Sequence, residues 1–287
     1  MSKNTDKYLN VDSVSIRYRE EGKGDTVVLV HGLAGFLEEW EPAMEKLKGF
    51  YRVIALDLPG HGLSGKPDIQ YTLDNLTDFL KEFVTAKKLE HFHLVGHSLG
   101  GAVCLNFVIK YPQFVNKLIV LNSAFIKIPF SIRFLSPFIF QKANFKIPFS
   151  IVRIISRKSF YKKKKITREW LNHAFIYINQ PGALRTMLSV IHECTSFHGL
   201  KKDLVCRFMK DLSTIKIPVL IAYGDRDRVL PTENSLLLHS FIKTSVLYRM
   251  ENCGHELQYE CCDAFCKIAV QFLGNRPFTC PRTAFSQ

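Results

Sequence analysis

Short apolar runs alternate with amphipathic segments along most of the chain. Residues 14–18 alternate like a strand. Runs rich in Val, Ile and Leu predict further strands at residues 26–30, 51–56, 91–95, 118–121, 219–223 and 246–250. Apolar positions at helical spacing follow Thr72, which can serve as an N-cap, and two later helices are expected over residues 233–242 and 257–272. Strands that alternate with helices predict an α/β protein with a mostly parallel sheet covered on both faces.

The middle of the chain breaks this rhythm. It contains eight phenylalanines between Phe125 and Phe160, interrupting prolines, and the hexapeptide Lys-Ile-Pro-Phe-Ser-Ile twice, at residues 127–132 and 146–151. Thr167 can cap a helix that extends through Tyr177, and another helix is expected from Pro181 through Cys194. These patterns predict a core formed by residues 1–121 and 213–274, a mainly helical cap at 122–212 and a C-terminal tail at 275–287.

The net charge of +13 is concentrated in the predicted cap. Residues 122–212 contain 17 Lys and Arg but four Asp and Glu, whereas the rest of the chain has 22 of each sign. Basic residues interleaved with Phe and Ile suit peripheral contact with an anionic membrane, although the run Lys162–Lys165 has the alternative of a solvated loop. No nucleic-acid-binding module is recognisable, so nucleic acid is not an expected partner.

Three features bear on the compartment. The first ten residues are polar and lack the apolar stretch of a signal peptide, and no run approaches the ~20 apolar residues of a membrane span. The eight cysteines include no C-x-x-C pair and no zinc-type spacing. We therefore expect reduced thiols and a cytoplasmic protein, with peripheral membrane contact as an option.

The strongest chemical motif is Gly96-His97-Ser98-Leu99-Gly100, between a predicted strand and a predicted helix. In this context the small residues allow a tight, strained turn that exposes the serine hydroxyl as a nucleophile. The Leu99 amide then lies at a helix N-terminus, where it can donate to an oxyanion.

A second oxyanion donor is expected from the loop after the strand at 26–30. Its sequence is His31-Gly32-Leu33-Ala34-Gly35, and such a loop supplies a backbone N–H beside the nucleophile. Leu33 is the first candidate for this donor and Ala34 the second.

A serine needs a base, and the base needs a carboxylate partner. Among ten histidines, His255 follows a strand and a glycine and precedes the last helix. The loop after the strand at 219–223 offers Asp225 and Asp227; Asp227 lies further into the loop and is preferred, and Asp225 is expected to be a turn residue.

These motifs resemble the α/β-hydrolase superfamily, in its capped esterase, lipase and C–C hydrolase branch. The resemblance spans residues 26–273 and includes the run from Asp57 to Ser64, the serine motif, the stretch 224–231 and Gly254-His255. It implies an eight-stranded sheet, the order nucleophile, acid, histidine, and no metal or organic cofactor. It also supports Asp227, three residues after Gly224, and implies that Asp57 and Ser64 are structural.

Three functions remain open at this point. The first is hydrolysis of carboxylic esters with apolar acyl chains, as in an esterase or a monoacylglycerol-type lipase. The second is hydrolysis of a C–C bond in diketone-type substrates by the same Ser98, Asp227 and His255. The third, from another class, is a ligand-binding or scaffold protein without turnover, which would not require these three residues together.

Overall fold

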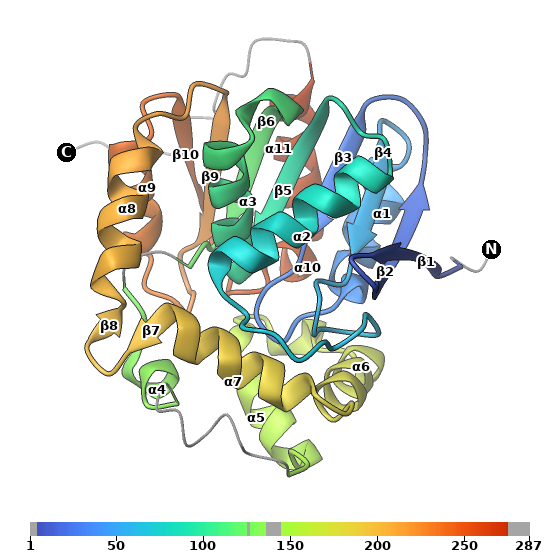
Figure 1. Ribbon diagram of the computed structural model, residues 1–287, viewed down its shortest axis with the longest axis vertical. Coiled ribbons are helices and arrows are strands. Elements are labelled where there is room, and N and C mark those ends of the chain that lie inside the picture. The colour runs from blue at the N-terminus through green and yellow to red at the C-terminus, as the bar shows by residue number, and fades with distance from the viewer. Residues whose placement is uncertain (1–4, 125–126, 136–144, 275–287) are drawn as a thin grey trace.

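The computed structural model describes residues 5–124, 127–135 and 145–274, and it is built on an eight-stranded sheet (Figure 1). The strand order is β1-β2-β4-β3-β5-β6-β9-β10. β2 pairs antiparallel with β1 and β4, and every other pair is parallel. The strands are β1 (Lys7–Val11), β2 (Val14–Glu21), β3 (Thr26–Val30), β4 (Arg52–Leu56), β5 (Phe92–His97), β6 (Val115–Leu121), β9 (Val219–Gly224) and β10 (Ser245–Met250).

Helices cover both faces of the sheet, as β3 illustrates. Val28 and Val30 pack into one apolar cluster with residues of α2 and α3, whereas Val27 and Leu29 pack into a second cluster with residues of α1 and α11. Because successive strand residues point to opposite faces, a strand buried on both sides must be apolar throughout. The helices around the core are α1 (Glu41–Leu47), α2 (Leu73–Ala86), α3 (Leu99–Lys110), α8 (Lys202–Leu212), α9 (Glu233–Phe241), α10 (Leu257–Glu260) and α11 (Cys262–Leu273).

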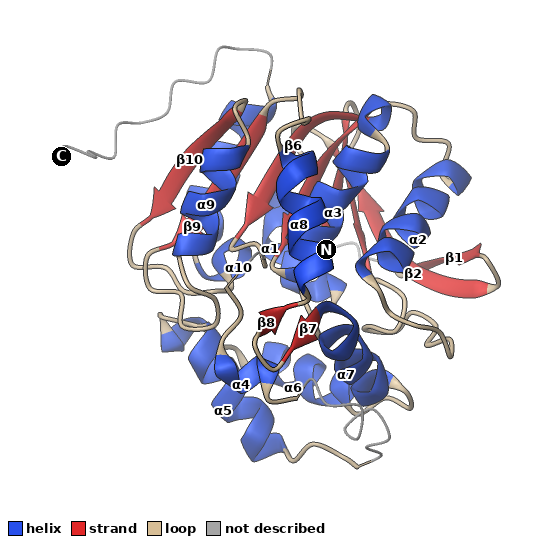
Figure 2. Ribbon diagram, turned by 60° about the vertical axis from the view of Figure 1, so that its left-hand side comes forward, coloured by secondary structure: helices blue, strands red, loops and turns tan. Residues whose placement is uncertain are grey.

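A layer of helices lies beyond one end of the sheet (Figures 1 and 2). It contains α4 (Phe130–Arg133), α5 (Phe149–Ser159), α6 (Arg168–Ile178), α7 (Ala183–Cys194) and the short hairpin β7 (Thr195–Ser196) and β8 (Gly199–Leu200). The repeated hexapeptide forms the same local structure twice, since a proline is the N-cap of both α4 and α5. α8 packs Phe208 and Leu212 into the apolar cluster of α2 and α3. The cap boundaries at residues 122 and 212 stay a prediction, and the predicted tail lies outside the described residues.

The predicted fold class is confirmed, and the local differences from the sequence patterns have simple causes. β1 was missed because all but one of its residues remain at least partly exposed, which leaves no apolar run. The closing helix expected over 257–272 is two helices, because the backbone at Cys261 (φ −118°, ψ 35°) leaves the helical region. Both predicted threonine caps form: Thr72 accepts from Asn75 N at 3.0 Å and Thr167 from Trp170 N at 3.0 Å.

Two further observations concern the compartment. The seven cysteines within the described ranges are free thiols. Among the helices of the described residues, none is long and apolar enough to cross a bilayer.

Candidate active site

Ser98 lies in a strained turn between β5 and α3. Its backbone has φ 53° and ψ −117°, a region that a residue with a Cβ rarely adopts. The flanking glycines are required by space: a Cβ on Gly96 would come within 2.4 Å of Gly100 O, and one on Gly100 within 2.3 Å of His31 O. Within the described part of the chain, Ser98 Oγ makes no hydrogen bond.

The loop after β3 runs directly against this turn. A Cβ on Gly32 would lie 3.0 Å from the Ser98 Cβ, and Gly35 N donates to Gly32 O at 3.1 Å to close a tight turn. Ala34 in this turn has φ 56°. No acceptor for the Leu33 or Leu99 N–H is found among the described residues, so both amides are available to a substrate oxygen.

His255 and Asp227 meet at the carboxyl ends of the neighbouring strands β10 and β9. His255 Nδ1 lies 2.7 Å from Asp227 Oδ2, and both side chains are buried. Asp227 Oδ1 accepts from the amides of Val229 and Leu230 at 2.7 and 2.9 Å, which fixes the carboxylate. Asp225 pairs instead with Arg249 at 3.0 Å. It is a turn residue and takes no part in the contact between His255 and Asp227.

The pKa of His255 is raised despite its burial. Burial lowers the pKa, but the charge of Asp227 and its hydrogen bond raise it by more, and the charge of Glu256 adds to the rise. Protonation of His255 therefore stabilises the fold below the unfolded histidine pKa of about 6.5. This contribution is lost as the pH rises through the higher folded pKa. The Asp227 carboxylate thus favours the protonated form of His255.

Asn122, directly after β6, connects the loops of the acid and the base. Its Nδ2 donates to Gly254 O at 3.0 Å and His255 O at 2.8 Å, and its Oδ1 accepts from Gly224 N at 2.9 Å. The sequence patterns did not point to this residue. The available signal is an Asn directly after the strand at 118–121, because Asn tolerates the conformation found there (φ 41°) better than most residues.

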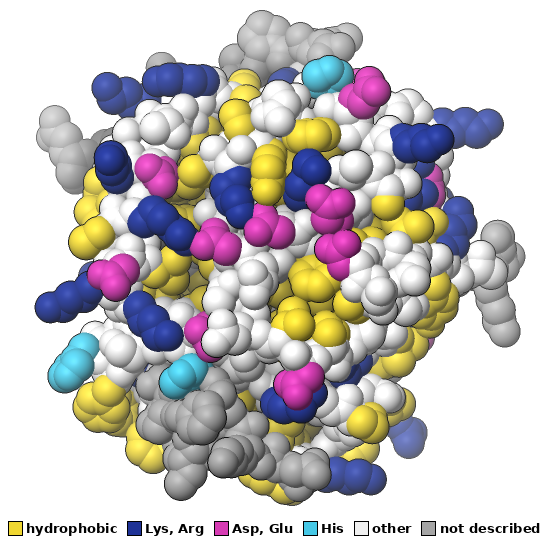
Figure 3. All heavy atoms as spheres, viewed as in Figure 1, with side chains coloured by type: hydrophobic (Ala, Val, Ile, Leu, Met, Phe, Trp, Pro, Cys, Tyr) yellow, Lys and Arg dark blue, Asp and Glu magenta, His cyan; other side chains and the backbone are white. Residues whose placement is uncertain are grey.

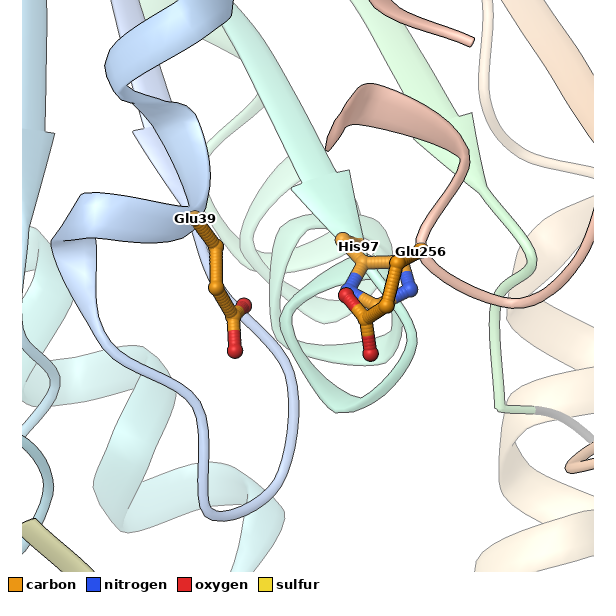
Figure 4. Close-up of side chains that lie close together, drawn as sticks. All are labelled: Glu39, His97 and Glu256. Atoms are coloured by element: carbon orange, nitrogen blue, oxygen red, sulfur yellow. The ribbon is translucent and has the colours of Figure 1, made fainter. Parts of the chain in front are cut away.

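A second group missed from the sequence surrounds His97. The carbonyl of His255 lies 2.9 Å from His97 Nε2, so this nitrogen carries the proton and Nδ1 faces the carboxylates of Glu39 and Glu256 (Figure 4). Each of these three side chains offers one ligand atom, and the three atoms lie within 4.8 Å of one another, so the group could hold a cation. Burial raises the pKa of both glutamates and lowers that of His97. Glu39 Oε2 has no hydrogen-bond partner among the described residues.

The cap is fastened to the loop that carries His255. The His255 N–H donates to Ser159 O, at the end of α5, at 2.7 Å. Glu260 accepts from Gly254 N at 3.1 Å and Tyr161 N at 3.0 Å, and also from Lys162 N. A displacement of α5 would therefore act directly on His255.

These groups share one cavity of about 500 Å³ between the core and the cap. Ser98, His255, Leu33 and Leu99 all line it, together with Glu39, His97 and Glu256. The rest of the cavity wall is mostly aliphatic, and Lys158 is the one Lys or Arg among the described residues that line it. The side chains from the cap and α8 include Ile128, Ile132, Leu135, Ile155, Met187, Val190, Ile191, Leu204, Val205 and Phe208.

Asp57 and Ser64 hold the core together. Asp57 accepts from Leu37 N at 2.7 Å and Leu63 N at 2.9 Å and pairs with Arg17 at 3.1 Å. Ser64 Oγ donates to Asp57 O at 2.8 Å. Both residues therefore have the structural role that the family resemblance implied.

Comparisons with known proteins agree with this fold. The family model for the alpha/beta hydrolase fold matches residues 25–145. A 2-hydroxy-6-oxo-6-(2'-aminophenyl)hexa-2,4-dienoic acid hydrolase of Metapseudomonas resinovorans is 27% identical over 94% of this chain and 91% of its own length. A 2-hydroxy-6-oxo-6-phenylhexa-2,4-dienoate hydrolase of Comamonas testosteroni is 28% identical over 95% and 98%.

A solved structure shows the same relationship. A serine hydrolase involved in carbazole degradation superposes with a TM-score of 0.81 at 25% identity, covering 95% of this chain and all of its own. The match extends over core and cap alike. The chain therefore belongs to the α/β-hydrolase superfamily and is a serine hydrolase of that fold.

Proposed function

We propose that the protein hydrolyses an apolar carbonyl compound through an acyl-enzyme on Ser98. The observation that carries this proposal is the 2.7 Å contact between His255 Nδ1 and Asp227 Oδ2 beside the strained serine turn, in one cavity. This contact leaves His255 Nε2 as the nitrogen that can accept the proton of the serine hydroxyl. An arrangement of nucleophile, base and carboxylate serves acyl transfer and has no use in binding alone.

The mechanism follows from the positions of these groups. Ser98 Oγ attacks the carbonyl carbon while its proton passes to His255 Nε2, and Asp227 stabilises the imidazolium. The Leu33 and Leu99 amides donate to the oxyanion. Collapse breaks the bond to the leaving group, which takes the proton from His255. Water, deprotonated by His255, then attacks the acyl-enzyme, and the acid product and free Ser98 are released.

We infer that the bond broken is a C–C bond next to a ketone. Relatives of 27% and 28% identity, matched over more than nine tenths of this chain, are dienoate hydrolases by name. In the keto tautomer of such a substrate, the carbon leaving group departs as a conjugated dienolate, whose negative charge is delocalised onto oxygen. Lys158 at the cavity wall is the candidate to bind the carboxylate of a dienoate.

Hydrolysis of esters with apolar acyl chains is the second candidate, and the lining of the cavity supports it. The wall of the cavity is mostly aliphatic. At the end of the cavity near Ser98, the carboxyl groups of Glu39 and Glu256 disfavour an anionic group of the substrate. Carboxyl groups at that end suit a leaving group that donates hydrogen bonds, such as a polyol. The same three residues would carry out this reaction.

Two measurements separate these possibilities. A fluorophosphonate probe should label the folded protein, and Ser98→Ala should abolish labelling and reduce turnover by at least about 10⁴-fold. Ser123→Ala is the matched control, since Ser123 is a buried serine of the adjacent loop. Folded wild type without labelling would favour a binding protein.

The labelled preparation is then compared on two substrates. One is a 2-hydroxy-6-oxo-6-phenyl dienoate, and the other is a series of p-nitrophenyl esters of increasing chain length. A kcat/KM for the dienoate well above that for every ester supports C–C cleavage. The reverse order supports ester hydrolysis and overturns our first assignment.

A further inference from the structure

α5 turns its apolar side outward. Val152, Ser156 and Ser159 form its buried face. At about 100° per residue, Ile154 lies nearly opposite this face, and Ile151 and Ile155 lie on one flank of the helix, between Ile154 and the buried face. The three isoleucines are 63%, 43% and 58% exposed, in that order. A helix that packs on a core normally shows the reverse arrangement, so this exposed face needs a partner.

Part of the outward face also lines the active-site cavity. Ile155 and Lys158 of α5 and Ile132 of α4 line the cavity. Phe130 of α4 is 53% exposed, and its ring contacts that of Phe197, which is 54% exposed, at a centroid distance of 5.5 Å. α5 lies at the end of the cap farthest from the sheet in both ribbon views (Figures 1 and 2). We call the exposed residues of α4, α5 and the β7–β8 turn the α4–α5 face.

The charge of this region has one sign. Residues 127–165 contain eleven Lys and Arg and no Asp or Glu. Arg153, Arg157 and Lys158 on α5 are exposed. Over the core, in the upper part of Figure 3, side chains of both signs are intermixed instead. The α4–α5 face therefore combines exposed aliphatic and aromatic groups with uncompensated positive charge.

We propose that the α4–α5 face docks on an anionic lipid bilayer, with the mouth of the cavity toward the lipid. Isoleucine and phenylalanine side chains enter the interfacial layer, and the arginine side chains beside them bind lipid phosphates. Delivery of an apolar substrate from the bilayer to Ser98 rests on the function proposed above. The docking itself does not depend on turnover.

Charge complementarity selects a bilayer over other partners. A nucleic acid would neutralise the basic residues but would leave the three exposed isoleucines in water. A bilayer surface satisfies both features, because aliphatic and aromatic groups partition into it while cations remain at the headgroups. The contact between Ser159 O and His255 N then connects the docked helix to the base of the site.

The test is sedimentation of the full-length protein with two kinds of vesicles, phosphatidylcholine alone and phosphatidylcholine mixed with phosphatidylserine. Arg153→Glu/Arg157→Glu tests the charge, with Lys216→Glu/Lys243→Glu as the matched control on exposed lysines of the core. Ile151→Ser/Ile154→Ser tests the apolar contact, with Phe50→Ser as the control, since Phe50 is 63% exposed on the core. None of these side chains lines the cavity, so fluorophosphonate labelling checks that each variant is folded.

We expect wild type to bind the mixed vesicles and to bind neutral vesicles at least about 10-fold more weakly. Reversal of the two arginines should lower binding by at least roughly 25-fold, because the loss of each basic residue alone costs about 5-fold. The isoleucine variant should lose about 10-fold, and both controls should bind as wild type does. Ser98→Ala should also bind normally, which separates this result from the enzymatic one.

Three outcomes would overturn the proposal. The first is equal recovery of wild type with neutral and anionic vesicles. The second is unchanged binding by the arginine variant. The third is binding that depends on the arginines and on salt but not on the isoleucines, which would mean nonspecific adhesion to any polyanion, including nucleic acid.

Discussion

Replacement of Asn122 should impair the reaction although its side chain does not line the cavity. Asn122→Asp retains the acceptor for Gly224 N and tolerates φ 41°. It loses the Nδ2 donor to Gly254 O and His255 O, and it brings a negative charge against these two carbonyls. The loop that carries His255 then loses its connection to β6.

The magnitude follows from these contacts. Asn122 is 4% exposed, so the acceptors that it leaves remain largely out of water. Loss of two buried hydrogen bonds costs about 1–3 kcal/mol each where the acceptor stays unpaired. His255 O keeps the contact with His97 Nε2 at 2.9 Å, which limits the loss there. We expect a decrease of about 2–4 kcal/mol in the free energy of unfolding.

The effect on catalysis should appear in kcat. A displacement of His255 by about 1 Å costs on the order of 10²-fold in rate, whereas the apolar wall that binds substrate is unchanged. The assays are urea unfolding, steady-state kinetics on the better of the two substrates, and the pH profile of kcat/KM. Asn122→Gly, which allows the same backbone conformation without any side-chain hydrogen bond, should resemble Asn122→Asp in kcat.

A different result would refute this reasoning. If Asn122→Asp lost stability but kept wild-type kcat and the wild-type pH profile, Asn122 would be a structural residue only. The position of His255 would then be determined by the cap and by Asp227.

Three more predictions concern the same site. Asp227→Asn should lower kcat/KM by about 10³–10⁴-fold and shift the acidic limb of its pH profile to lower pH, because the carboxylate raises the pKa of its histidine partner. Gly100→Ala should prevent stable folding, because the new Cβ would lie 2.3 Å from a backbone carbonyl oxygen. Its control is Gly49→Ala, which has open space around it and should show the same urea-unfolding curve as wild type. Glu39→Gln should stabilise the protein by about 1–3 kcal/mol in urea unfolding at pH 7. This gain should fade as the pH falls toward about 4.3, because burial and Glu256 raise the pKa of Glu39; the exposed Glu90→Gln is its control.

The strands and helices that the sequence predicts are those that a local pattern of apolar and polar residues determines. The strand at 26–30 was predicted with its observed bounds, because full burial on both faces requires a continuous apolar run. Strand β1 has no such requirement at the sheet edge, and its sequence carries no signal. The break at Cys261 was not visible either, because Leu257–Glu260 and Cys262–Leu273 each have ordinary helical composition.

The residues of the candidate site likewise divide into those that local sequence patterns indicate and those that they do not. Ser98 and His255 were identified because strand, turn and glycine spacing are local properties of the sequence. Asn122 follows β6, His97 ends β5 and Glu39 lies beyond β3, and their importance arises only when the sheet brings the ends of these strands together. A glutamate after a loop resembles any surface glutamate until its burial is known.

The connection between cap and base gives the basic insertion a role in the chemistry. The cap supplies most of the apolar wall, and it also binds the His255 loop through Ser159 O, while Glu260 on the core side accepts from Gly254 N and Tyr161 N. These hydrogen bonds lie immediately beyond α5, the helix whose outer face is apolar and basic. A force on that face therefore has a short covalent and hydrogen-bonded route to His255, the proposed base.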